Sequence, residues 1–233
     1  MANGTPRAQL LLAIAALALF IAPLQTWLML GGDLTEHLRY ETLPGQATYV
    51  LSKLCALYAI ELVWLQAMLG LLRHQVIAVG LAPSTWKRAH ATLGLAALAF
   101  VVAHVTLFIA ATSMRNRISA LDLLLPWGSG VYRTWVAFGA AALWLIFVGA
   151  AVQAALQLSV AKRRWLHQLT LVGLGLAVIH SLAIGTESRS GTMAWAAGTM
   201  AVLLVAAALH RVFSALRDGH DKTKLTQRIE GTS

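Results

Sequence analysis

The chain has 233 residues, of which 58% are hydrophobic and only 12% are charged, and its mean hydropathy is +0.70. Soluble domains are about 25% charged, so this composition excludes an ordinary soluble globular protein and predicts an all-α integral membrane protein. The net charge of +9 lies in short basic clusters between apolar runs. Such clusters indicate contact with anionic membrane lipid, and they give no reason to expect nucleic acid as a partner.

Six apolar runs are long enough to cross a bilayer as helices. The first, residues 8–30, follows a short segment, 1–7, and has no small-x-small cleavage site near its end, which favours a retained helix over a signal peptide. The polar residues 31–45 then suit a loop. The other five runs are residues 46–72, 87–112, 133–156, 165–185 and 193–216.

Local signals refine the connections between these runs. Pro83-Ser84 predicts the start of the third helix, and residues 118–127 are amphipathic enough to form a short helix in the membrane interface. The polar tail, 217–233, is predicted to be mobile. The chain is therefore predicted to form one transmembrane domain, residues 8–216, with a short polar segment at each end.

The distribution of lysine and arginine predicts the orientation of the chain. With six spans, twelve of these residues fall on one side of the membrane and six on the other. Because positively charged loops stay in the cytoplasm, both termini are predicted to be cytoplasmic, in a multi-pass protein of the cell membrane. The third and fifth spans then run parallel, and both start at the cytoplasmic side.

Those two spans each carry two histidines, His90 with His104 and His167 with His180. The separations of 14 and 13 residues correspond to about 21 Å and about 20 Å along an ideal helix. On parallel spans the side chains form two level pairs, His90 with His167 and His104 with His180. Two such pairs are the ligand set of two bis-histidine b-type haems stacked across a bilayer. The alternative is four interior polar residues that hydrogen-bond between helices, although ionisable residues at membrane depth are usually functional.

The second separation fits an ideal helix less well than the first. Thirteen residues leave His180 roughly 140° from His167 around the helix axis. Gly173 and Gly175 lie between them, and glycines there allow the helix to bend and a flat macrocycle to approach the backbone.

The patterns Lys87-Arg88-Ala89-His90…His104 and Arg164-Trp165-Leu166-His167…His180 resemble the ferric-reductase-like transmembrane domain. NADPH oxidases, eukaryotic ferric reductases and the haem-binding subunit of the bacterial periplasmic methionine sulfoxide reductase system share that domain. The resemblance covers residues 8–216 and implies a six-helix bundle with two stacked haem sites between spans three and five. It implies that His90 and His167 bind the iron of an inner haem b, and that His104 and His180 bind the iron of an outer one.

The resemblance also implies a function. The chain is expected to be a transmembrane b-type cytochrome, an oxidoreductase component without catalytic residues of its own. It would take electrons from a cytoplasmic flavin reductase, or from FMN or FAD bound at the cytoplasmic face. The extracytoplasmic acceptor would be a reductase partner, ferric iron or oxygen.

The chain departs from the oxidases and ferric reductases in three respects. They continue into a cytoplasmic FAD- and NADPH-binding region, whereas residues 217–233 contain no GxGxxG fingerprint, so we expect dependence on a separate reductase. Phe108 replaces a further histidine of the oxidases, which disfavours superoxide production. Gly173 replaces an aromatic residue between the haems, and Phe100 is the nearest alternative. The compact form is most similar to the methionine sulfoxide reductase haem subunit. This similarity leaves open whether the chain binds one haem or two.

Two further residues have two interpretations each. Glu61, near the middle of the second span, suits either a proton path or an interhelical hydrogen bond that fixes packing. Lys53 suits either a contact with a haem propionate or a side chain that extends to the membrane surface.

Two alternative functions also remain, namely a quinol-linked cytochrome b that anchors a dehydrogenase, and a non-redox membrane transporter whose histidines bind metal.

Overall fold

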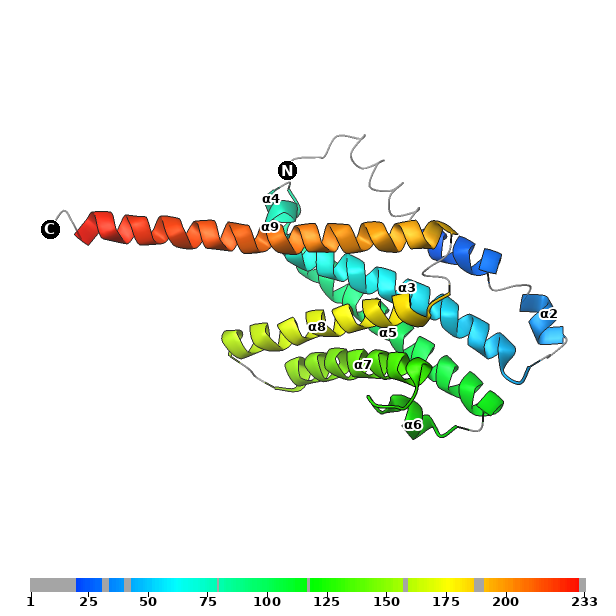
Figure 1. Ribbon diagram of the computed structural model, residues 1–233. Helices are drawn as coiled ribbons and strands as arrows, with labels where there is room; N and C mark the ends of the chain where they lie inside the picture. The colour runs from blue at the N-terminus through cyan, green and yellow to red at the C-terminus, as the bar shows by residue number, and fades with distance from the viewer. Residues whose placement is uncertain are drawn as a thin grey trace.

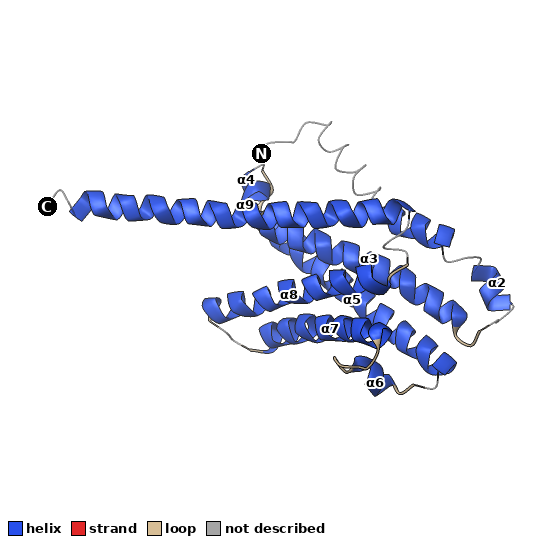
Figure 2. Cartoon of the chain, in the orientation of Figure 1, coloured by secondary structure: helices blue, strands red, loops and turns tan. Residues whose placement is uncertain are grey.

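A computed structural model describes residues 20–30, 34–39, 43–78, 80–116, 118–156, 159–186 and 191–230. Within these ranges every regular element is a helix, and no strand is present (Figure 2). The helices are Phe20–Leu30, α2 (Leu34–Arg39), α3 (Gln46–Leu71), α4 (Arg73–Ala78), α5 (Pro83–Asn116), α6 (Ala120–Leu124), α7 (Val131–Ala155), α8 (Val160–Ile184) and α9 (Gly191–Glu230).

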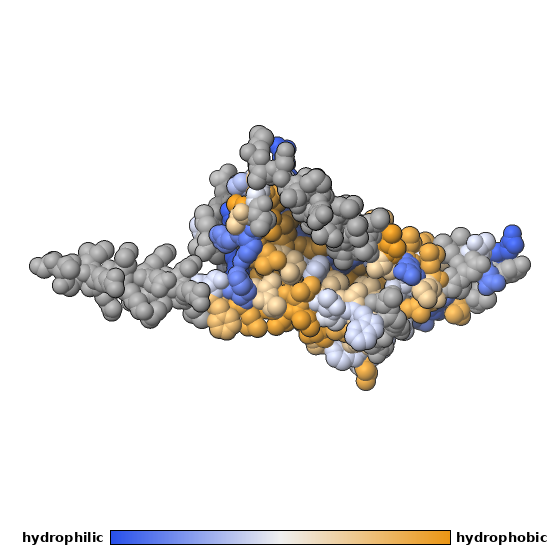
Figure 3. All heavy atoms as spheres, turned by 90° about the horizontal axis from the view of Figure 1, so that it is seen from above, coloured by the Kyte–Doolittle hydropathy of each residue, from blue (hydrophilic) through white to orange (hydrophobic). Residues whose placement is uncertain are grey.

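Five of these helices, α3, α5, α7, α8 and α9, are long and apolar enough to cross a membrane. They expose large apolar side chains that a water-soluble bundle would bury, among them Leu95 at 71% and Trp195 at 82%. On the face drawn in Figure 3, hydrophobic residues cover the middle of the molecule and strongly hydrophilic ones gather toward its ends. The prediction of an all-α protein is confirmed, and the helices are compatible with a multi-pass membrane protein.

The predicted first span is described only in part. Residues 8–19 lie outside the described residues, and Phe20–Leu30 forms an apolar helix shorter than a membrane span.

The short helix predicted within residues 118–127 is present as α6, and the Ser119 side chain caps its first turn by accepting a hydrogen bond from the Leu121 amide.

The long helices agree with the predicted runs within a few residues, except that α8 begins earlier, at Val160, and α9 ends later than predicted. The segment 31–45, predicted to be a loop, contains the short helix α2. The third helix begins at Pro83, as its helix-start signal predicts. In contrast, α9 continues from the sixth predicted span through most of the predicted mobile tail, to Glu230, and projects beyond the bundle (Figure 1). The residues after Leu216 include no proline, so no residue incompatible with a helix stops α9 at the polar boundary.

The spans pack as two antiparallel pairs. One pair is α3 with α5 and the other is α7 with α8, while α3 also contacts α8 and α9 (Figure 1). The backbones of α5 and α8, the two histidine-bearing helices, approach closely at hardly any point in the described chain. The two backbones are therefore not in direct contact, and side chains or a ligand occupy the space between them.

Tryptophan side chains connect the remaining elements to α3. The Trp27 indole N–H donates to the Val50 carbonyl at 2.6 Å, and Trp27 and Val50 belong to a buried cluster with Leu57 and Met193. The Trp64 indole N–H donates to the Met200 carbonyl of α9 at 2.7 Å. These bonds matter in an apolar environment, where an unsatisfied indole N–H or carbonyl is costly.

The close contact between α7 and α8 depends on a glycine. A Cβ atom on Gly173 of α8 would lie 2.9 Å from the Ile146 Cγ1 atom and 3.2 Å from the Ala142 carbonyl oxygen of α7. Glycines are enriched at such interfaces because they let helix backbones approach. Gly173 thus serves helix packing, and the prediction that it lets a macrocycle approach the backbone is wrong at this position. A Cβ atom on Gly175 would meet nothing within 4 Å.

We expect Gly173→Ala to destabilise the protein by about 1–3 kcal/mol, because the added methyl group overpacks the α7–α8 interface. Gly198→Ala in α9 is the matched control, since its Cβ would meet nothing within 4 Å and alanine is the better helix former. Thermal unfolding in detergent measures both. Equal melting temperatures for the two variants would contradict the packing role.

Candidate functional site: two histidine pairs between α5 and α8

The first pair joins α5 to α8 at one end of the bundle, which we call the His90 end. The ring centroids of His90 and His167 are 5.9 Å apart, and the ring planes make an angle of 71°. Two imidazoles on one metal ion, each at about 2.0–2.1 Å, place their ligating nitrogens about 4 Å apart and their ring centroids about 6 Å apart. The separation of the two rings therefore suits two ligands on opposite sides of one metal ion.

The His90 ring also belongs to a stack with one aromatic and one cationic side chain. The Trp86 indole lies parallel to the His90 ring, at 5.3 Å between centroids and 12° between planes, and donates a hydrogen bond to the Leu69 carbonyl at 2.9 Å. The Arg73 guanidinium lies 4.9 Å from the Trp86 ring, as in a cation–π contact. The His90 Nδ1 atom is buried, and the ring interacts with the main chain of Gln66 on α3 in addition to the Trp86 stack.

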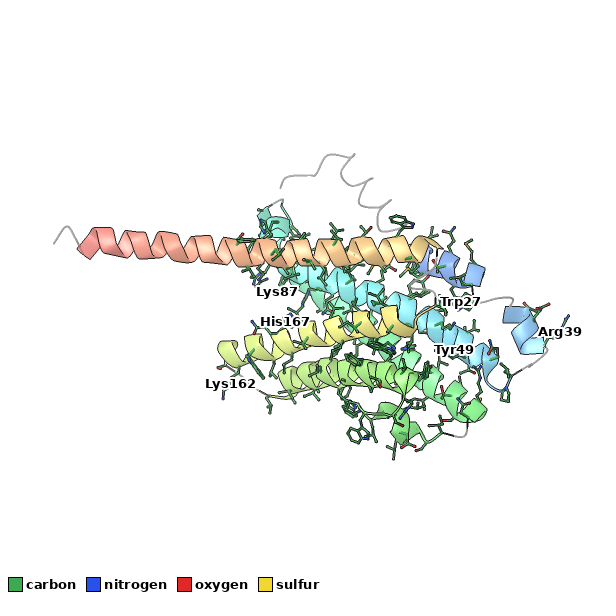
Figure 4. The ribbon with its side chains drawn as sticks, in the orientation of Figure 1. Trp27, Arg39, Tyr49, Lys87, Lys162 and His167 are labelled. Carbon is green, nitrogen blue, oxygen red and sulfur yellow. The ribbon has the colours of Figure 1, made fainter. Side chains whose placement is uncertain are left out.

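The His90 end is also basic. Figure 4 shows Lys87 and Lys162 at the same end of the bundle as His167, with Tyr49 and Trp27 at the opposite end. The Arg211 side chain of α9 donates to the Gly70 carbonyl at 3.1 Å, which links α9 to the end of α3.

The second pair lies near the other end of the same helices, which we call the His104 end. The His104 Nδ1 atom is 2.9 Å from the Ser52 carbonyl oxygen of α3, and the His180 Nδ1 atom is 2.7 Å from the Trp135 carbonyl oxygen of α7. A carbonyl oxygen can only accept, so Nδ1 carries the proton in both rings. Nε2 is then left in each ring with a lone pair that can ligate a metal.

Both rings line one cavity, which lies between the two helix pairs. It contains about 1380 Å³ of atom-free space, including the open space at its mouth. Its wall is mostly apolar and comes from α3, α5, α7 and α8, with contributions from Leu123 and Leu124 of α6. The cavity thus presents two metal-ligating nitrogens in a space from which water is largely excluded by aliphatic side chains.

A glycine makes room for one of these rings. A Cβ atom on Gly139 of α7 would lie 2.8 Å from both the Cε1 and the Nδ1 atoms of His180. Only glycine at this position lets the imidazole lie against α7 and reach the Trp135 carbonyl.

These features fit a bis-histidine haem. Metal-ligating histidines usually donate their second ring nitrogen to a carbonyl or carboxylate, which fixes the tautomer and the ring orientation, and His104 and His180 both do so. Among the described residues no group of three or more histidine, cysteine or acidic side chains is placed to hold a metal ion.

Lys53 and Phe108 lie near His104, whereas Glu61 and Phe100 do not line the cavity. Lys53 lines the cavity at the His104 end and donates to the Thr186 hydroxyl at 3.2 Å, while Glu61 is buried at 5% exposure and does not line that cavity. Phe108 lies 6.2 Å from His104 between ring centroids, whereas Phe100 contacts Tyr58 and is not part of the cavity wall.

Sequence reasoning missed the groups that orient the histidines. Trp86 lies one helical turn before His90, so its spacing is a signal that could have indicated a stacking partner. Gly139 and the carbonyls of Ser52 and Trp135 carry no such signal, because which main-chain groups face a histidine depends on tertiary packing.

Comparison with known proteins gives no further guidance. No protein-family model matches the chain, and neither the curated proteins nor the solved structures contain a significant match. The case for a function therefore depends on the residues and their geometry.

The geometry predicts the protonation of the rings. In neutral His104 and His180 the proton should be on Nδ1, the less common tautomer of free histidine, whereas the exposed His74 should show the common one. ¹⁵N NMR of histidine-labelled protein distinguishes the two. Gly139→Ala should move the His180 signals and leave those of His104 in place, while Gly175→Ala should change neither. Protonated Nε2 in both rings would contradict the assigned hydrogen bonds.

Proposed function

We propose that the chain is a transmembrane b-type cytochrome that passes electrons from a cytoplasmic flavin reductase, through two bis-histidine haems, to an extracytoplasmic acceptor. The observation that carries this proposal is the pair His104 and His180, whose Nδ1 protons are bound by carbonyls of neighbouring helices and whose Nε2 atoms are thereby left for a metal in one apolar cavity. The spacing of His90 and His167 supports a second site of the same kind.

The chain's own residues hold and insulate the redox centres. His90 with His167, and His104 with His180, supply the axial ligands, and the helices fix the distance between the two sites. Haem, when bound, supplies the one-electron chemistry. The aliphatic wall from α3, α5 and α7 lowers the local dielectric and limits access of water, which are factors that set a haem potential.

The proposed orientation follows from the distribution of basic residues. Both termini lie in the cytoplasm, residues 8–30 supply a sixth span, and the domain covers residues 8–216 of a cell-membrane protein. The His90 end then faces the cytoplasm and holds the inner haem. Its basic side chains, which include Arg73, Lys87, Arg88 and Lys162, suit the docking of an acidic reductase surface or a flavin phosphate, FMN or FAD. The acceptor at the other face is a reductase partner, ferric iron or oxygen.

We expect removal of one ligand to remove one haem. His90→Ala and His167→Ala should each lose the same haem, and His104→Ala and His180→Ala should each lose the other, because each iron needs both of its ligands. Haem content and the reduced absorption spectrum of the purified variants measure this. His74→Ala, in the exposed α4, is the control and should bind haem normally. If His90→Ala instead resembled His104→Ala, the pairing would be wrong.

We also expect reduction to need a second protein. The described chain offers no strand–turn–helix unit of the kind that holds a dinucleotide. Haem-loaded protein in detergent should therefore stay oxidised with NADPH or NADH alone and become reduced when a flavin reductase and free flavin are added.

Charge reversal tests the docking surface in the same assay. Reversing Lys87, Arg88 and Lys162 together should slow enzymatic reduction, with a marked salt dependence, and should leave reduction by dithionite unchanged. Rapid reduction by NADPH alone would contradict the proposal. Reduction by a quinol without any flavin enzyme would favour the quinol-linked alternative, and protein that binds metal ions but no haem would favour the transporter.

A further inference from the structure

Three basic side chains converge at the His104 end, from three different helices. Lys53 belongs to α3, Arg115 to the last turn of α5 and Arg133 to the first turns of α7. The Lys53 ammonium and the Arg115 guanidinium each lie 5.0 Å from the centroid of the Tyr49 ring. We call Tyr49, Lys53, Arg115, Tyr132 and Arg133 the cationic cluster.

This cluster adjoins the cavity that contains His104 and His180. Tyr49, Lys53 and Tyr132 line that cavity, and both guanidiniums lie within electrostatic range of the Tyr132 hydroxyl. Of the three cations, Lys53 lines the cavity and the two arginines do not, so the cluster places positive charge beside one end of the cavity, where it suits the anionic group of a ligand.

Each arginine of the cluster is held by one hydrogen bond and has another donor without a partner. Arg115 donates to the Gln46 side-chain oxygen at 2.6 Å, and Arg133 donates to the Asp122 main-chain oxygen. The Arg115 Nε atom and the Arg133 Nη1 atom are buried and unpaired. Buried unpaired donors on charged groups are costly, so they indicate a binding partner that completes the site.

We propose that the cationic cluster binds a carboxylate group. Each of the two guanidiniums has one unpaired donor, and arginine forms its strongest charge-assisted hydrogen bonds with planar anions such as carboxylates. The carboxylate comes either from a propionate of a haem bound to His104 and His180, or from a small ligand that enters from solution. The first source rests on the proposed function, and the second does not.

Citrate is the probe for a ligand from solution. Purified full-length protein without haem is titrated with citrate by calorimetry, against chloride at the same ionic strength. Arg115→Gln and Arg133→Gln should each weaken citrate binding about tenfold or more, since each removes a charge-assisted hydrogen bond. Arg39→Gln is the control, because Arg39 is exposed on α2, outside the cluster, and should bind citrate normally.

Infrared difference spectroscopy of the haem-loaded protein tests the other source. If a propionate occupies the cluster, the carboxylate bands in the reduced-minus-oxidised spectrum should shift in Arg115→Gln and Arg133→Gln, and not in Arg39→Gln. A shift with no citrate binding identifies the propionate, and citrate binding with no shift identifies a solution ligand.

The proposal is overturned if citrate binding and the propionate bands are both the same in the two cluster variants as in the unchanged protein. It is also overturned if Arg39→Gln reproduces their effect, since the cause would then be general charge. If either glutamine variant fails to fold, Arg115→Lys and Arg133→Lys keep the charge and lose the planar fork, and they should still weaken binding. Protein that binds no haem contradicts the proposed function alone, because the citrate measurement does not use haem.

Discussion

A histidine offers one nitrogen to a metal only when its other nitrogen carries the proton, and in this chain the main chain of neighbouring helices determines which nitrogen that is. The Ser52 carbonyl of α3 and the Trp135 carbonyl of α7 accept the Nδ1 protons of His104 and His180. The hydrogen bonds fix the rotation of both rings and leave both Nε2 atoms as ligands. Because the acceptors belong to α3 and α7, the position of these two helices determines what α5 and α8 can bind.

The packing of the bundle follows from the same requirement. The backbones of the histidine-bearing helices hardly approach each other within the described residues, and each helix packs on another one, α5 on α3 and α8 on α7. Glycines allow α7 and α8 to approach closely. Gly173 of α8 leaves room for the α7 backbone, and Gly139 of α7 leaves room for the His180 ring. At the other pair, the His90 ring stacks on the Trp86 indole and also interacts with the Gln66 main chain of α3.

Much of this arrangement could be predicted from the sequence, because it depends on local chemistry. Apolar runs identified the helices from Gln46 onward, and proline identified the start of α5 at Pro83. The interval between His90 and His104 indicated that both rings lie near one face of α5. The end of α9 could not be predicted from polarity alone, because a polar sequence without proline can continue a helix into solvent. The acceptor carbonyls, the role of Gly139 and the unpaired nitrogens of Arg115 and Arg133 depend on contacts between distant segments, which the sequence pattern does not encode.

We propose that α5 and α8 together hold haem iron between pairs of imidazoles. Near-infrared magnetic circular dichroism of the oxidised, purified protein tests it most directly, because the charge-transfer band of low-spin ferric haem reports the two axial ligands. We expect bis-histidine ligation for the bound haem, at two haems per chain by iron analysis. Protein isolated from haem-replete cells with no haem bound, or with haem whose axial ligands are not two histidines, would contradict it.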